Sequence, residues 1–160
     1  MQILIPRAER AATLLKARGE TVAVSESSTG GLISAALLAI PGASAYFIGG
    51  GVIYTRKAGS ELLQVAAEQA KGLRSTTEPY ALFVARTMCA KLGASWGIGE
   101  TGATGPSPNR FGDVGRSAVA IVGPREMSRV IDTKSDDRVA NMRAFAEAAL
   151  DLLVEALEAK

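Results

Sequence analysis

Short apolar runs alternate with helix-like segments along this chain, and this alternation limits the possible folds more than any other feature. Strand-like runs occupy residues 20–26, 45–55, 95–106, 115–123 and 127–134. Helical periodicity occupies residues 7–19, 30–39, 60–70, 77–92 and 137–158. The order predicts an α/β fold in which one sheet is covered by helices on both faces.

The composition is that of a compact globular domain. With 160 residues, 48% of them hydrophobic and 21% charged, the chain is about one domain in length, and we expect a single domain over residues 1–160. Every apolar run is interrupted by Gly, Pro or a charge, and the first helical segment carries several charges. We therefore expect no membrane partner and a cytoplasmic location. A net charge of +2 and only 5% aromatic residues argue against a nucleic-acid partner.

The chain contains no histidine, which restricts its chemistry sharply. A Ser-His-Asp triad, a histidine general base and an imidazole metal site are all excluded, and we expect no metal. The single cysteine, Cys89, lies in an apolar-periodic segment, where a buried structural thiol is more common than a nucleophile. Any catalytic base must therefore be another type of residue.

The first strand-like run leads into a turn of small and hydroxyl residues, Ser27-Ser28-Thr29-Gly30-Gly31, before a helix begins. Backbone N–H groups at a helix N-terminus, with glycines that permit close approach, are typical of a site for an anionic group. A plainer interpretation is that Ser28 or Thr29 only caps the helix.

A second loop rich in Gly and Thr follows a different strand, at residues 99–113. Its candidate ligand-binding residues are Thr101, Gly102, Thr104 and Gly105. In open α/β sheets, ligands bind beyond the carboxyl ends of strands, where loops lead into helices. We therefore expect the two loops to face each other, and their joint presence favours a binding site over simple capping.

Four motifs, taken in order, resemble the CinA C-terminal domain, the nicotinamide-nucleotide amidohydrolase (NMN deamidase) family. They are an E-S-x-T-G-G turn, a P-G-x-S helix end, a G-x-V-x-Y strand and a T-G-x-x-G-P loop. The resemblance runs over nearly the whole chain. It implies a three-layer α/β/α sandwich that hydrolyses the carboxamide of nicotinamide mononucleotide (NMN) to nicotinic acid mononucleotide and ammonia, without a cofactor. It also implies homo-oligomers.

The resemblance assigns catalytic roles residue by residue. Ser44 matches the serine that we expect to be the nucleophile, and Tyr54 matches the family tyrosine. The family lysine five residues after that tyrosine is replaced here by Gly59. Because a serine needs an adjacent base, Lys57 is the nearest substitute: on a strand it would keep the same side as position 59, and in a helix it would be displaced. Alternatively, Lys57 is a solvated lysine beside Arg56.

Two arginines in the last helical segment, Arg138 and Arg143, match the family's basic positions there, although Arg143 comes one residue later than expected. Either guanidinium could hold a phosphate or polarise a carbonyl, and we favour Arg138. Exposed helix arginines are more often only solvated. The second loop also departs from the family, because residues 107–110 replace its glycines.

The leading functional hypothesis is hydrolysis of NMN by a serine mechanism, with a small-molecule nucleotide as the partner. The loss of the family lysine motivates a second hypothesis, a catalytically inactive relative that binds a nucleotide in a regulatory role. The altered loop motivates a third, an amidase for a different small amide. Fold alone does not decide among them.

Overall fold

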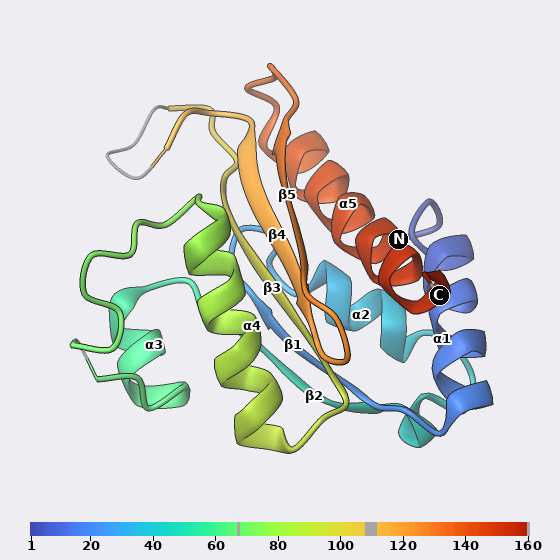
Figure 1. Ribbon diagram of the computed structural model, residues 1–160. Coiled ribbons are helices and arrows are strands. Elements are labelled where there is room, and N and C mark those ends of the chain that lie inside the picture. The colour runs from blue at the N-terminus through green and yellow to red at the C-terminus, as the bar shows by residue number, and fades with distance from the viewer. Residues whose placement is uncertain (67, 108–111, 160) are drawn as a thin grey trace.

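A five-stranded sheet with helices on both faces forms the protein (Figure 1). The computed structural model describes residues 1–66, 68–107 and 112–159. The strands are β1 (Val22–Glu26), β2 (Phe47–Val52), β3 (Trp96–Ala103), β4 (Arg116–Val122) and β5 (Met127–Asp132). The helices are α1 (Ile5–Arg18), α2 (Leu32–Leu38), α3 (Arg56–Leu62), α4 (Glu78–Leu92) and α5 (Arg138–Glu158), with a short 3₁₀ turn, η1 (Ala43–Ala45), before β2. The predicted α/β fold is confirmed.

The sheet has the order β2-β1-β3-β4-β5 and is mixed. Strand β1 runs parallel to both neighbours, with Val24 opposite Gly50 of β2 and Ile98 of β3. Strands β4 and β5 run antiparallel to their neighbours. The carboxyl ends of β1, β2 and β3 therefore meet at one edge of the sheet, where β4 begins.

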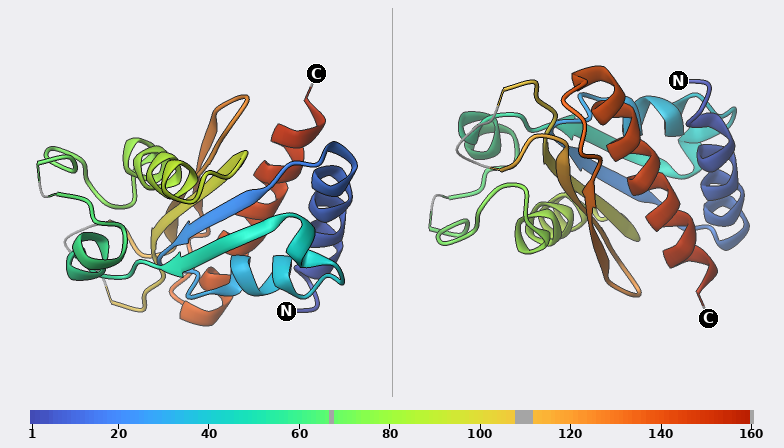
Figure 2. Two further views of the ribbon diagram at one scale, coloured as in Figure 1. Left: turned by 90° about the horizontal axis from the view of Figure 1, so that it is seen from below. Right: turned by 90° about the horizontal axis from the view of Figure 1, so that it is seen from above.

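Helices cover the sheet in two layers (Figure 2). Helices α2 and α5 pack on one face, and α1 packs against both of these helices. The main core on this face includes Leu15, Ile33, Trp96, Ile121 and Leu153, all at most 1% exposed. Helix α4 covers the other face. Among the described residues, no helix is both long and apolar enough to cross a membrane.

Helix α4 lies unusually close to β3 because two positions of that strand carry no side chain. A Cβ atom at Gly97 would lie 2.5 Å from the carbonyl oxygen of Ala85, and one at Gly99 would lie 2.1 Å from that of Ala81. Real Cβ atoms do not approach backbone oxygens so closely. The glycines therefore set the spacing between α4 and the sheet.

Most of the predicted elements agree with the structure to within a few residues, but the predicted helix at residues 60–70 is wrong. Helix α3 begins earlier, because the hydroxyl oxygen of Thr55 accepts a hydrogen bond from the N–H of Ala58 at 3.1 Å and caps it. The helix ends at Leu62, and Gln64 has a positive φ of 56°. This shift places Lys57 and Gly59 inside a helix.

Candidate functional site

A cavity of about 590 Å³ opens at the shared carboxyl edge of the parallel strands. We call it the Ser27 cavity. It is lined by the turn after β1, the segment from the end of β2 into α3, the start of α4 and the end of β3. Its lining residues are Ser27, Ile53, Tyr54, Thr55, Arg56, Lys57, Ser75, Tyr80, Thr101 and Gly102.

A second cavity of about 370 Å³, which we call the Arg138 cavity, lies next to the first. Tyr54 and Gly102 line both. The remaining lining comes from Ser28, from the end of β3 and the loop after it, and from the start of α5, namely Ala103, Thr104, Gly105, Pro106, Ser107 and Arg138. The structure thus brings the two predicted loops together, as expected; residues 108–111 of the second loop lie outside the described residues.

The buried carboxylate of Glu26 fixes the turn after β1 by accepting hydrogen bonds from backbone N–H groups. Glu26 is 1% exposed, and its two oxygens accept hydrogen bonds from the N–H groups of Gly31 (3.0 Å), Ile33 (3.1 Å) and Ser34 (3.0 Å). The hydroxyl of Ser34 also donates to it, at 2.6 Å. These are the amides at the start of α2 that were expected to face a ligand.

A second buried carboxylate, that of Glu100 on β3, holds the other half of the turn. It is 1% exposed and accepts hydrogen bonds from the N–H groups of Ser27 (3.0 Å) and Thr29 (3.1 Å). The hydroxyls of Ser28 and Ser117 donate to its other oxygen. The prediction that these backbone amides bind an anionic ligand is therefore wrong, because the protein's own carboxylates already occupy them.

One hydroxyl of the turn remains available for chemistry, that of Ser27. The Ser28 hydroxyl donates to Glu100, and Thr29 Oγ1 lies 2.7 Å and 3.0 Å from the carboxylates of Glu26 and Glu100. The Ser27 hydroxyl makes no hydrogen bond with any described residue, is half-buried and lines the cavity that bears its name. Ser27 thus lines the same cavity as Tyr54, Lys57 and a second serine, Ser75.

Ser44, the serine expected to be the nucleophile, lies elsewhere. It is exposed in η1, which precedes the amino end of β2, whereas Tyr54 follows the carboxyl end of that strand. A strand of six residues spans about 20 Å at roughly 3.3 Å per residue. Ser44 is therefore separated from Tyr54 and Lys57 by the length of β2, and within one chain the proposed pairing with Lys57 does not form.

Arg138 joins α5 to the candidate site. Its Nη1 donates to the carbonyl oxygen of Gly105 at 2.7 Å, and its Nη2 donates to the hydroxyl oxygen of Tyr54 at 3.3 Å. The residue before it, Asp137, caps α5 by accepting from the N–H of Ala140 at 3.0 Å. Arg143 is exposed further along α5 and lines neither cavity. Of the two arginines, the structure brings only Arg138 to the site.

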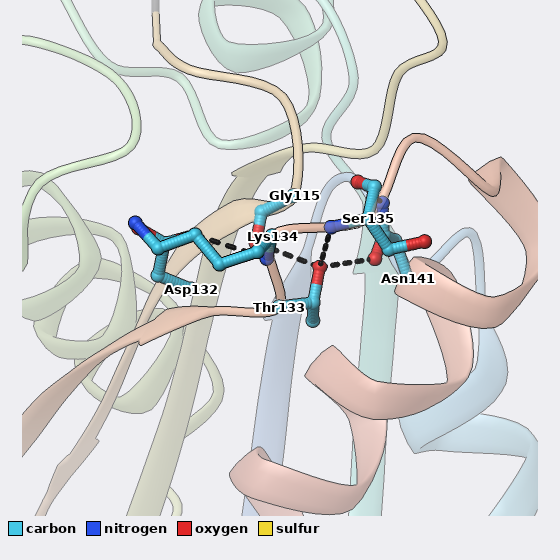
Figure 3. A network of polar contacts seen from close by, with 6 residues as sticks. All are labelled: Gly115, Asp132, Thr133, Lys134, Ser135 and Asn141. Atoms are coloured by element: carbon cyan, nitrogen blue, oxygen red, sulfur yellow. Dashed lines mark hydrogen bonds and ion pairs between the residues drawn. The ribbon is translucent and has the colours of Figure 1, made fainter.

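A polar network links Asn141 of α5 to Thr133 and to the segment before the helix (Figure 3), and it also reaches the loop that carries Gly105. Asn141, 1% exposed, donates from Nδ2 to the carbonyl oxygens of Thr104 (2.9 Å) and Ser135 (2.8 Å). Its Oδ1 accepts from the hydroxyl of Thr133. Arg138 lies on the turn of α5 between these contacts, so its position toward the cavity is set by the loop and the helix together.

Lys57 lines the Ser27 cavity but does not take the place of the family lysine. It is exposed in the first turn of α3. Residues two apart on a helix point in directions about 200° apart, so Lys57 and Gly59 face different sides. Lys57 is therefore displaced from the side of position 59, as expected if the segment is a helix. The side of α3 that the family lysine would occupy is left without a side chain.

Sequence reasoning missed the two residues that brace the site most strongly. Glu26 was recognised only as part of a motif, and Glu100 was not singled out. A charged residue in the otherwise uncharged strand at residues 96–103 was the available signal. Buried charges are rare unless they are paired or fully hydrogen-bonded, so such a residue indicates a polar network.

Comparison with known proteins identifies the family of the chain. The model of the CinA C-terminal domain matches residues 5–157 of the chain. The chain belongs to the CinA C-terminal domain family. The family predicted from the four motifs is thus confirmed.

Curated relatives of this CinA domain are named CinA-like proteins. One from Anaeromyxobacter sp. (strain K) is 40% identical over 146 residues, which cover 89% of this chain and 35% of that protein. One from Chloroherpeton thalassium is 35% identical over 161 residues, covering 97% of this chain and 38% of that protein. The CinA domain described here thus spans a little over a third of the length of these relatives.

Solved CinA structures share the fold over nearly the whole chain. The competence/damage inducible protein CihA from Agrobacterium tumefaciens is 28% identical with a TM-score of 0.88, covering 98% of this chain and 96% of that chain. A CinA superfamily protein from Klebsiella pneumoniae is 26% identical with a TM-score of 0.87, covering 96% and 97%. The three-layer α/β/α architecture implied by the resemblance is confirmed.

Proposed function

We propose that this CinA domain hydrolyses the carboxamide of NMN to nicotinic acid mononucleotide and ammonia, with Ser27 as the nucleophile in place of Ser44. The observation that carries the proposal is the unbonded hydroxyl of Ser27, which lines one cavity together with Lys57 and Tyr54. A hydroxyl with no internal acceptor is free to give its proton to a base and attack an acyl carbon.

The chemistry needs only groups of this cavity and water. Ser27 Oγ attacks the carboxamide carbon while the amine of Lys57 takes the hydroxyl proton. As the C–N bond breaks, that proton passes to the leaving nitrogen and ammonia departs. Water then attacks the acyl-serine ester, releases the acid and restores the Ser27 hydroxyl. The Tyr54 hydroxyl, already an acceptor for Arg138, can donate to the developing oxyanion.

The charge of the two cavities supports an anionic substrate. Arg56 and Arg138 line them, and the described lining of both contains no aspartate or glutamate. Neither Arg56 nor Arg138 makes an ion pair with any described residue. Guanidinium groups bind phosphate oxygens in a two-pronged geometry, so arginine suits the phosphate of a mononucleotide. These side chains replace the backbone amides as the anion-binding groups.

Release of ammonia from NMN by the purified protein tests the proposal, with chromatographic identification of the acid product. We expect turnover in the parent protein and a loss of at least about a hundredfold in Lys57→Ala, because a positioned base contributes about 10²- to 10⁴-fold. Ammonia release unchanged in Lys57→Ala would remove this lysine from the mechanism. Absence of turnover despite measurable nucleotide binding would contradict hydrolysis.

Gly59 favours a second candidate function, nucleotide binding without hydrolysis. It stands at the position of the family lysine and has no side chain to act as a base. The space for one is present: a Cβ atom at Gly59 would meet only Cγ2 of Ile53, at 3.9 Å. A lysine can therefore be returned to this helix position without a clash.

Gly59→Lys should raise the rate of ammonia release from NMN at least about tenfold, because it restores a base beside the cavity. Gly59→Ala, which fills the same backbone position without an amine, should leave the rate unchanged. If the parent binds NMN without turnover and Gly59→Lys becomes active, the binding function is correct. If Gly59→Lys gives no gain in either case, position 59 does not supply the base in this chain.

A further inference from the structure

A third cavity, of about 530 Å³, lies between α3, α4 and the segment that joins them. We call it the α3–α4 cavity. Its interior is largely apolar, and the motifs read from the sequence did not point to it. Apolar side chains that line it are Leu63, Val65, Leu73, Phe83 and Val84. Two of these, Leu63 and Val84, are 4% and 3% exposed, so the interior of the cavity reaches the packed layer beneath α3 and α4.

The α3–α4 cavity adjoins the Ser27 cavity. Arg56, Lys57, Ser75 and Tyr80 line both. Gly59 lines the α3–α4 cavity on the α3 side, and no side chain projects from it to narrow the space. A largely apolar space therefore borders the Ser27 cavity at Arg56.

The chemistry of the lining changes at this border from charged to aromatic. Arg56 stands on the shared wall without an ion-pair partner among the described residues. Beyond it, the rings of Tyr80 and Phe83 lie 6.3 Å apart between centroids, at an interplanar angle of 42°. Burial raises the pKa of the Tyr80 hydroxyl, and the positive charge of Arg56 partly offsets this effect. The Tyr80 ring thus presents a neutral face to the cavity.

A ligand that fits both the charged wall at Arg56 and the aromatic cavity beside it carries an anionic linking group followed by a flat apolar ring. We propose that the α3–α4 cavity is a second subsite, for the purine base of a dinucleotide whose pyridine end lies beside Ser27 and whose diphosphate passes Arg56. Bases stack on aromatic side chains, and a cavity of several hundred Å³ accepts a group of this size. The inference rests on the proposed function only for the placement of the pyridine end.

Isothermal titration calorimetry of the parent protein with NMN, nicotinamide adenine dinucleotide and adenosine monophosphate tests this subsite. We expect the dinucleotide to bind at least about tenfold more tightly than NMN, the gain that stacking of one base typically provides. Adenosine monophosphate should compete with the dinucleotide. Equal affinities for NMN and the dinucleotide would overturn the inference.

Two variants test whether the α3–α4 cavity causes the higher affinity for the dinucleotide. Gly59→Leu fills the α3–α4 cavity and should reduce the dinucleotide's advantage to below about threefold, whereas Gly59→Ala, its matched control, should preserve it. Phe83→Leu keeps an apolar side chain but removes the ring, and should weaken only the dinucleotide, because Phe83 does not line the Ser27 cavity. Equal weakening of both ligands by Gly59→Leu or by Phe83→Leu would overturn the proposal.

The binding readout separates this inference from the proposed hydrolysis. Preference for the dinucleotide, with no ammonia released from either ligand, would support the subsite and contradict the amidase activity. Hydrolysis of NMN with no preference for the dinucleotide would support the amidase activity and contradict the subsite. Failure of both ligands to bind would overturn both.

Discussion

Ser27→Ala is expected to lower the turnover of NMN by about a thousandfold or more, whereas Ser44→Ala should remain within about twofold of the parent. Removal of a nucleophile abolishes the covalent route and leaves only what binding and the remaining polar groups provide. Ser27 lines the candidate cavity with Lys57 and Tyr54, while Ser44 is exposed at the other end of β2. The measurement is kcat and KM from ammonia release at saturating NMN.

These two variants form a matched pair, because each replaces a hydroxyl group by hydrogen and neither removes a hydrogen bond made to a described residue. Circular dichroism and the midpoint of thermal unfolding should be unchanged in both. If the parent shows no turnover, the pair is made in the Gly59→Lys background. Loss of activity in Ser44→Ala, with Ser27→Ala active, would place the nucleophile at the opposite end of β2 and contradict the assigned site.

Glu100→Gln is expected to lower the free energy of unfolding by about 3 kcal/mol, because it turns one acceptor into a donor inside a set of donors. The N–H groups of Ser27 and Thr29 and the hydroxyls of Ser28 and Ser117 all point at this carboxylate. An amide nitrogen there leaves buried donors facing one another. Equilibrium unfolding in urea measures the change.

Glu126→Gln is the matched control for Glu100→Gln. Glu126 is an exposed glutamate that pairs with Arg86 at the surface, so its replacement should leave the free energy of unfolding unchanged within error. Glu100→Gln should also reduce turnover, since the N–H of Ser27 is held by this carboxylate. Stability equal to that of the parent would show that residue 100 does not act as a charged acceptor.

The separation of Ser44 from Tyr54 and Lys57 within one chain has a reason that is already present in the sequence. Residues 45–55 were predicted to form a strand, with Ser44 just before it and Tyr54 near its end. Within one chain the two ends of a strand of this length do not share a site, because an extended chain rises about 3.3 Å per residue. Motif matching treated both residues as neighbours, whereas strand geometry separates them.

The role of Glu100 could not be read from the sequence in the same way. Its contacts with Ser27 and Thr29 join positions more than 70 residues apart. They depend on the parallel pairing of β1 with β3, in the register that places Ser25 opposite Gly99. Periodicity predicts that two segments are strands, but it does not specify which strands pair or in which register. The acceptor for the turn amides therefore became visible only in the structure.

The position of α3 was mispredicted because local propensity was considered without its cap. Residues 60–70 are rich in Leu, Ala, Glu and Gln, which favour helix. The hydroxyl of Thr55 nevertheless begins the helix at Arg56, and the chain turns away after Leu62. This start of the helix also decides the orientation of Lys57 relative to position 59. Residues two apart point to the same side of a strand but to different sides of a helix.

The absence of side chains at Gly97 and Gly99 has a consequence for the width of the candidate site. Tyr80, which lines the Ser27 and α3–α4 cavities, directly precedes Ala81, whose carbonyl oxygen rests over Gly99. Any larger residue at position 99 would lift the start of α4 and carry the Tyr80 ring outward. The dimensions of the pocket are therefore adjustable from beneath the helix, by residues that no ligand touches.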